Sequence, residues 1–134
     1  PMPHFADITV LEAHLRAVHA PFGPLSDAEW RHLAESSARR DADGVLRLHY
    51  DPAIARAFSV GEVAEIDLSP LWAAIAQPVL ILRGATSDVL PRDAALRMAR
   101  KPGTSLVEIP ETGHAPALMA ADQIDAIKGF LNAP

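Results

Sequence analysis

Apolar residues recur at helical spacing near the start of the chain, at Ile8, Leu11, Leu15 and Val18. This period of three to four residues predicts an amphipathic helix over residues 7–20. Two prolines and a glycine follow directly. We expect them to end the helix, because proline lacks the backbone N–H that the next turn would need.

The clearest helix start in the sequence lies at Ser26. Ser26 and Glu29 have the spacing of a capping box, in which each side chain accepts a hydrogen bond from the other residue's backbone N–H. Leu25 and Trp30 occupy the two positions of a hydrophobic staple around this box. We therefore predict a helix over residues 26–38, followed by a charged turn.

The pattern is weaker in the middle of the chain. Residues 45–50 alternate loosely between apolar and polar, which predicts a short extended segment. Asp51-Pro52 and Ser69-Pro70 each combine a capping residue with a proline at the first helical position. These pairs predict two short helices, over about residues 52–58 and 70–76.

The character of the chain changes after Pro78, where Val79 to Leu82 form a continuous apolar run. Such a run is typical of a strand that is buried on both faces, as in a parallel sheet. A helix over 91–101, a β-rich run over 105–109 and a last helix over 120–131 are predicted to follow. Because crossover connections are right-handed, we expect the two strands to be parallel neighbours.

These segments divide the chain into two parts. Residues 1–76 are predicted to be all-helical, since they contain no run that is convincing as a central strand. Residues 77–134 are predicted to form a βαβα unit, with two parallel strands and flanking helices. The predicted fold class is therefore α/β.

Composition excludes several classes of function. Of the 134 residues, 49% are hydrophobic, which is enough for a packed core. The 12 basic and 17 acidic side chains give a net charge of −5, and this argues against nucleic acid as a partner, because a nucleic-acid surface needs clustered basic residues. The chain contains no cysteine, so it has no disulfide and no nucleophilic thiol.

We expect a cytoplasmic protein without a membrane partner. Charged residues within the first twenty positions exclude the apolar core of a signal peptide. The longest uncharged stretch, residues 68–82, is too short for a transmembrane helix and contains two prolines. The absence of cysteine is compatible with a reducing compartment.

Two loops that follow predicted strands contain candidate catalytic residues. RGATSDVL, after the first strand, contains Asp88, and PETGHAPAL, after the second, contains His114. In open α/β sheets the loops after the carboxyl ends of strands meet at one crevice. A carboxylate there can accept the imidazole N–H and leave the other ring nitrogen as a general base. Taken singly, each residue is more often an ordinary loop residue, but the pair in matching loops favours two members of a catalytic triad.

Residues 78–131 resemble the C-terminal end of an α/β-hydrolase. PVLILRGATSDVL is similar to the strand and acid loop of that family, and LVEIPETGHAPAL is similar to its histidine strand and loop. The family's chain order of nucleophile, acid and histidine implies that Asp88 is the triad acid and His114 the triad base. Residues 1–76 resemble the helical cap that such enzymes insert before the acid strand. The resemblance implies no cofactor.

The resemblance also implies that the nucleophile is missing. In this family it lies on an elbow of pattern G-x-S-x-G, and none of the seven serines here has that context. The chain is therefore expected to be the C-terminal half of a longer hydrolase, with a break at Pro1. Two parallel strands alone leave unpaired edges, so we expect the N-terminal half, or another chain, to pair with the strand at 79–83. A homo-oligomer is an alternative.

The implied function is hydrolysis of a small, apolar, ester-like substrate through a covalent intermediate. His114 would deprotonate the absent nucleophile and later a water molecule, and Asp88 would orient His114. Four other chemistries of the same family are alternatives: dehalogenase, epoxide hydrolase, carbon–carbon bond hydrolase and haloperoxidase. A non-catalytic interaction module that completes a partner's sheet is an alternative from a different class. The chain alone is expected to be inactive in every case.

Other candidate site residues are weaker. Trp30, Trp72 and Phe58 are candidates to line a substrate pocket, although packing between cap and core is the more common role of such side chains. We predict no metal site, because the other five histidines lack the spacing of metal ligands: His4, His14, His19, His32 and His49.

Overall fold

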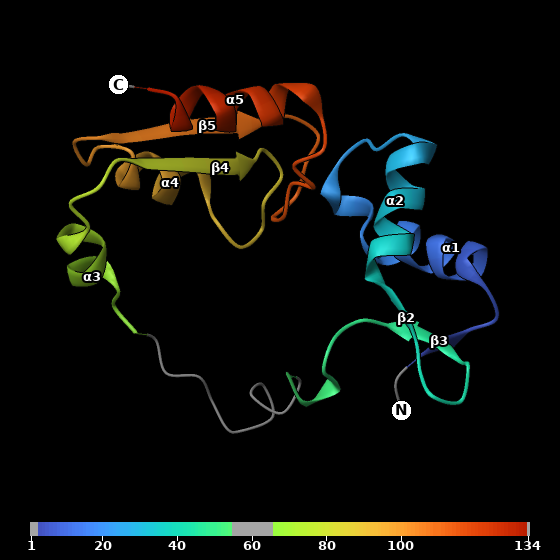
Figure 1. Ribbon diagram of the computed structural model, residues 1–134. Coiled ribbons are helices and arrows are strands. Elements are labelled where there is room, and N and C mark those ends of the chain that lie inside the picture. The colour runs from blue at the N-terminus through green and yellow to red at the C-terminus, as the bar shows by residue number, and fades with distance from the viewer. Residues whose placement is uncertain (1–2, 55–65, 134) are drawn as a thin grey trace.

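The computed structural model describes residues 3–54 and 66–133 (Figure 1). In chain order its elements are β1 (His4–Phe5), α1 (Ile8–Val18), the 3-10 helix η1 (Ala20–Phe22), α2 (Asp27–Ser37), β2 (Ala38–Arg40), β3 (Leu46–Leu48), α3 (Ser69–Ala74), β4 (Val79–Gly84), α4 (Arg92–Met98), β5 (Thr104–Ile109) and α5 (Ala121–Leu131). None of the helices in these ranges combines the length and the apolar character that a membrane crossing requires.

The first two helices begin as predicted. The Asp7 carboxylate accepts hydrogen bonds from the first backbone N–H groups of α1. At the start of α2 the Ser26 hydroxyl accepts from Glu29 N–H at 3.3 Å, and the Glu29 carboxylate accepts from Ser26 N–H at 2.7 Å. The backbone N–H of Ser26, together with its hydroxyl, holds the pKa of Glu29 below its ordinary value. Both predicted helices are confirmed, with slightly shorter bounds.

The prediction that residues 1–76 are all-helical is wrong. Strands β1, β3 and β2 form a three-stranded antiparallel sheet in that order. β3 is the short extended segment that the sequence predicts, but β1 and β2 have only two and three residues and show no alternating pattern. The hairpin between β2 and β3 depends on a turn, in which Gly44 has φ +79° and donates to Asp41 O at 2.9 Å. Arg47 on β3 also pairs with Asp41.

A hydrophobic core joins this sheet to α1 and α2. Leu11 and Leu15 on α1 are fully buried, and they pack with one aromatic residue from each of β1 and α2, Phe5 and Trp30. The arginine side chain of Arg16 lies over the Trp30 ring, 5.6 Å from its centroid. The amphipathic faces of the two predicted helices therefore bury one another, as their spacing indicates.

The segment around α3 matches its prediction in part. α3 begins at Ser69, and the backbone N–H of Ser69 donates to the Asp67 carboxylate at 2.9 Å. Ser69 is therefore the first residue of the helix and not the capping residue that we predicted. Residues 52–54 form a 3-10 turn, with Ala53 N–H bonded to the Asp51 carboxylate. The remainder of the helix predicted over 52–58 lies outside the described residues.

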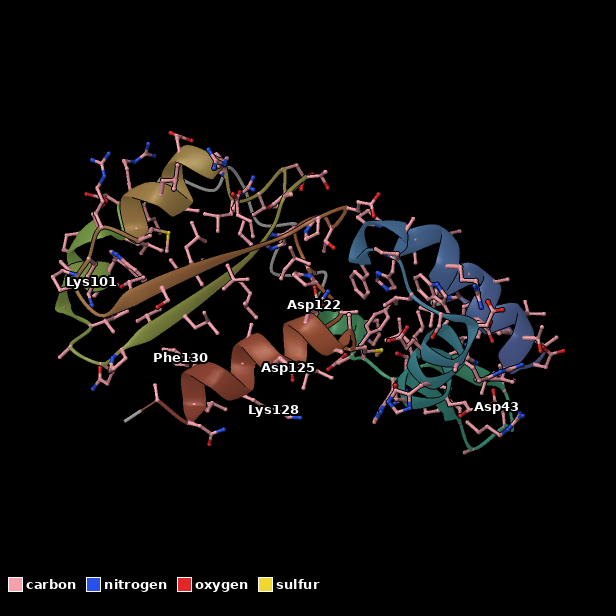
Figure 2. All side chains as sticks on the ribbon, turned by 90° about the horizontal axis from the view of Figure 1, so that it is seen from above. Asp43, Lys101, Asp122, Asp125, Lys128 and Phe130 are labelled. Atoms are coloured by element: carbon pink, nitrogen blue, oxygen red, sulfur yellow. The ribbon has the colours of Figure 1, made fainter. Side chains whose placement is uncertain are left out.

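The second part of the chain is the predicted βαβα unit. β4 and β5 are parallel, with Val79 opposite Thr104 and Gly84 opposite Ile109. α4 and α5 lie on opposite faces of these two strands (Figures 1 and 2). The parallel pairing of β4 and β5, with α4 as the connection between them, is the arrangement that the element order predicts. The carboxyl ends of both strands therefore lie at the same edge, where the two candidate loops begin.

Candidate functional site

The loops after β4 and β5 are bonded to each other beyond the ends of the strands. Ala85 N–H donates to Ile109 O at 2.8 Å. Thr86 donates twice to Thr112 O, through its N–H at 3.0 Å and its hydroxyl at 2.9 Å. These bonds hold the loop that carries Asp88 beside the loop that carries His114.

Two glycines make the close approach of these loops possible. A Cβ on Gly84 would overlap the backbone carbonyl groups of Gly113 and Thr112. A Cβ on Gly113 would lie 2.7 Å from the Cβ of Pro21. Gly113 N–H donates to Pro21 O at 2.6 Å, so η1 lies directly against the histidine loop. The first part of the chain therefore contacts the βαβα unit at the candidate site.

Gly84→Ala is expected to destabilise the fold by about 3 kcal/mol or more, because the overlapping atoms belong to backbone that cannot rotate away. The matched control is Gly129→Ala on α5, where a Cβ meets nothing within 4 Å. This control should stabilise the fold by roughly 0.5–1 kcal/mol, because alanine favours helix. Urea unfolding followed by circular dichroism measures both changes. Equal effects of the two substitutions would show that the loops are not packed in this way.

Asp88 and His114 line one pocket, of about 380 Å³. The opposite wall comes from the end of α1 and from η1, and it includes Val18, His19, Pro21 and Phe22. Both candidate side chains are exposed, and within the described residues no hydrogen bond joins them. The structure thus brings the two predicted residues to one pocket without a hydrogen bond between them.

His19 is a pocket residue that the sequence alone does not reveal. Its ring stacks on Phe22, with centroids 4.4 Å apart and planes at 19°. Burial, and to a smaller extent the neighbouring His14, hold the pKa of His19 below its ordinary value. A neutral imidazole can both donate and accept a hydrogen bond. No local pattern could indicate this role, because it depends on the contact between η1 and a loop some ninety residues later along the chain.

The loop that carries Asp88 is anchored at both ends by Arg83, which is only 5% exposed. Arg83 Nε donates to Leu90 O at 2.8 Å, and its Nη1 donates to Ala85 O at 3.2 Å. The same Nη1 lies 2.9 Å from a carboxylate oxygen of Glu108 on β5. A charged residue at the end of an apolar strand is the sequence signal that could have identified this partly buried ion pair.

Arg83→Leu is expected to lower the free energy of unfolding by roughly 2–3 kcal/mol, because it leaves two carbonyl groups and one oxygen of the Glu108 carboxylate without the Arg83 donor. The other oxygen of Glu108 keeps its partner, Arg92 Nε, at 3.1 Å. The control is Arg97→Leu on α4, whose ion pair with Asp93 is exposed. Exposed ion pairs contribute little to stability, so the control should unfold at nearly the wild-type urea concentration. Similar losses in both variants would contradict the anchoring role of Arg83.

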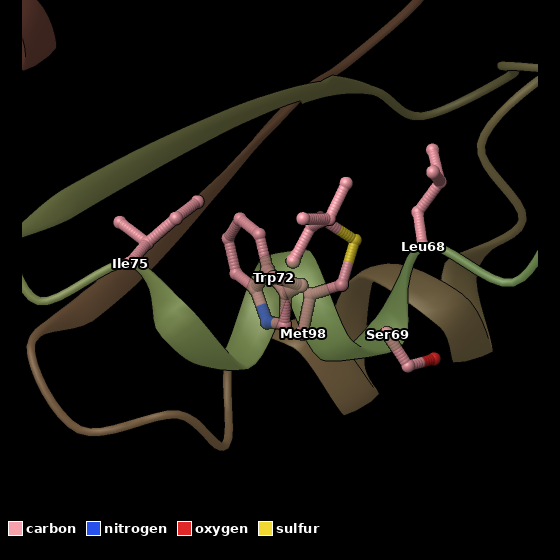
Figure 3. Close-up of a pocket in the computed structure, with 6 residues that line it drawn as sticks. Leu68, Ser69, Trp72, Ile75 and Met98 are labelled. Carbon is pink, nitrogen blue, oxygen red and sulfur yellow. The ribbon is translucent and has the colours of Figure 1, made fainter.

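The weaker candidates lie elsewhere in the structure. Trp30 belongs to the core between α1 and α2. Trp72 lines a separate apolar pocket of about 630 Å³ between α3 and α4, together with Ile75 and Met98 (Figure 3). Phe58 lies outside the described residues. Neither tryptophan is among the residues that line the pocket with Asp88 and His114. Across the described ranges, no three His, Asp or Glu side chains gather closely enough to hold a metal ion.

Comparisons with known proteins agree with this architecture. A 3-hydroxybutyrate-oligomer hydrolase from Cupriavidus necator is 38% identical over 121 residues, which cover 84% of this chain and 41% of that protein. The solved structure of an alpha/beta hydrolase from Novosphingobium aromaticivorans is 34% identical, with a TM-score of 0.83 over 96% of this chain and 47% of that chain. The structure of E-2-(acetamidomethylene)succinate hydrolase is 29% identical, with a TM-score of 0.72 over 98% and 48% of the two chains.

The chain spans less than half the length of each of these relatives. The sequence model of the alpha/beta hydrolase family matches residues 2–126, which is most of the chain. The parallel strands β4 and β5, with helices on both faces, have the corresponding fold. The chain therefore belongs to the alpha/beta hydrolase family.

Proposed function

We propose that this chain supplies the acid and the base of a hydrolytic triad, with Asp88 as the acid and His114 as the base. The pocket that they share at the carboxyl ends of β4 and β5 carries this proposal. Their order along the chain, acid before histidine, is the order in which this family uses them. The bonds from Thr86 to Thr112 O support it, because they fix the backbone of one loop against the other.

The nucleophile in this proposal comes from outside the 134 residues. None of the seven serines lies in a G-x-S-x-G elbow, and the chain spans 41% of the length of its relative from Cupriavidus necator. His114 removes the proton of the nucleophile as it attacks the ester carbonyl, and then gives that proton to the leaving alcohol. A water molecule, deprotonated by the same imidazole, releases the acid product in the second half of the reaction.

Asp88 orients His114 in this mechanism by accepting the N–H of its other ring nitrogen. This hydrogen bond requires rotation of the two side chains, which are exposed, while the backbone of both loops stays bonded. The carboxylate also stabilises the imidazolium that forms in the transition state. The two residues would then act as one unit.

The proposed substrate is a small ester of a hydroxy acid. Support comes from the 38% identity to a protein named for hydrolysis of 3-hydroxybutyrate oligomers. The pocket volume of about 380 Å³ suits a small molecule. Its lining also combines the Phe22 ring with hydrogen-bonding groups, as a short aliphatic ester requires.

We propose that the nucleophile-bearing part, or another chain, pairs with the strand at 79–83. Within the described residues β4 and β5 form a two-stranded sheet, so each strand has one edge without a strand beside it. Large apolar side chains on α3 and in the loop after β4 are also exposed, among them Leu71 and Val89. Sedimentation of the 134-residue chain mixed with its nucleophile-bearing part should therefore show a complex of the two. Absence of this complex, together with a stable monomer of the chain alone, would contradict this pairing.

The direct test of the proposed function is an ester assay on the complete hydrolase, in which this chain is combined with its nucleophile-bearing part. We expect turnover of p-nitrophenyl esters and of the 3-hydroxybutyrate dimer by the complete enzyme. The 134-residue chain alone should show none. Absence of turnover by the complete enzyme would favour a non-catalytic role for this chain.

A further inference from the structure

A second pocket opens beside the pocket of Asp88 and His114, and the two share His19. Its volume is about 390 Å³. Ser36 and Ser37, from the end of α2, form one wall, and His49 and Tyr50, which follow β3, form another. The pairing of β2 with β3 explains why these two walls face one pocket, because it brings the end of α2 beside the residues that follow β3.

The walls of the second pocket are fixed by backbone contacts. His49 N–H donates to Ser37 O at 2.7 Å. This bond extends the β2–β3 pairing by one residue on each strand, past the pair Ala38 and Leu48. Leu15, which is fully buried, also lines the pocket. The polar side chains that line the second pocket therefore belong to segments that the backbone bonds and the core around Leu15 hold in place.

The chemistry of the second pocket suits a neutral or acceptor-rich ligand. Its described lining contains two hydroxyls, a phenol and two imidazoles, but no carboxylate and no lysine or arginine. Hydroxyls and neutral imidazoles both donate and accept hydrogen bonds. An ester carbonyl can accept from them, and a terminal hydroxyl can also donate to them. The first pocket, in contrast, contains the Asp88 carboxylate.

We infer that the second pocket is a subsite for a second hydroxyacyl unit of an oligomeric ester, with His19 at the junction between this unit and the unit at the scissile bond. The inference rests on the proposed function, because the first pocket must hold the scissile ester. Stacking on Phe22 fixes the plane of the His19 ring between the two pockets. An ester with a single hydroxyacyl unit would fill only the first pocket.

The test compares two substrates in the complete hydrolase: methyl 3-hydroxybutyrate, which has one hydroxyacyl unit, and the 3-hydroxybutyrate dimer, which has two. The variants are Tyr50→Phe and Ser37→Ala, each of which removes a hydroxyl from the second pocket. Loss of one hydrogen bond to the substrate should lower kcat/KM for the dimer roughly 5- to 10-fold more than for the methyl ester. Ser105→Ala, at an exposed position of β5, is the control. It should leave the ratio of kcat/KM for the dimer to kcat/KM for the methyl ester unchanged.

The outcomes separate this inference from the proposed function. In one outcome, Tyr50→Phe and Ser37→Ala leave the ratio of kcat/KM for the dimer to that for the methyl ester unchanged, while hydrolysis still depends on His114. This outcome would show that the second pocket does not hold the substrate. Hydrolysis that does not depend on His114 would overturn the proposed function itself, and the inference with it. Circular dichroism of each variant verifies that the fold is retained.

Discussion

The His114→Ala variant of the complete hydrolase is expected to lose roughly 10⁴- to 10⁶-fold in kcat, with little change in KM. Alanine removes the group that takes the proton of the nucleophile, and this proton transfer occurs in the transition state rather than in substrate binding. The stability of the fold should change little, because the His114 side chain is exposed. Initial rates with a p-nitrophenyl ester over a range of concentrations give kcat and KM separately.

The control for this variant is His32→Ala. His32 is also exposed, but it lies on α2 and lines neither the pocket of Asp88 nor the second pocket. Its kcat should equal that of the wild type. Equal turnover by the His114→Ala enzyme would remove His114 from the mechanism.

The Asp88→Asn variant is expected to lose roughly 10³- to 10⁴-fold in kcat. The amide has nearly the same shape as the carboxylate, but it carries no charge and presents donors as well as an acceptor. It therefore holds the imidazole in the wrong tautomer and does not stabilise the imidazolium. The same ester assay measures this loss.

Asp93→Asn is the matched control for the acid. Asp93 is exposed on α4, where it pairs with Arg97, and it does not line the pocket. Its kcat should match the wild type. If both substitutions left kcat unchanged, another carboxylate would have to serve as the acid, or His114 would act without one.

The parts of the fold that could be predicted are those encoded by local patterns. The capping box at Ser26 and the apolar run at Val79 each determine a structure within a few residues. The parallel pairing of β4 with β5 follows from the order of elements and the handedness of crossovers. Asp88 and His114 could be identified for the same reason, because their loops begin where these two strands end.

The features that the sequence does not reveal depend on contacts between distant segments. The strands β1 and β2 are too short to carry a pattern, and their pairing follows from a turn and from the burial of Phe5. The contact of Pro21 with Gly113 brings His19 to the pocket, and no periodicity encodes it. The separate sites of the two tryptophans likewise follow from packing: Trp30 faces α1, and Trp72 faces α4.

The most direct test of the central claim, that Asp88 and His114 act as one unit, is the kcat of the double variant Asp88→Asn/His114→Ala. Residues that act as a unit have strongly non-additive effects on kcat. Once His114 is removed, Asp88 has nothing to orient, so we predict that the double variant and His114→Ala differ by less than about threefold. A further loss as large as that of Asp88→Asn alone would show that the two residues act independently, and would contradict the proposed triad.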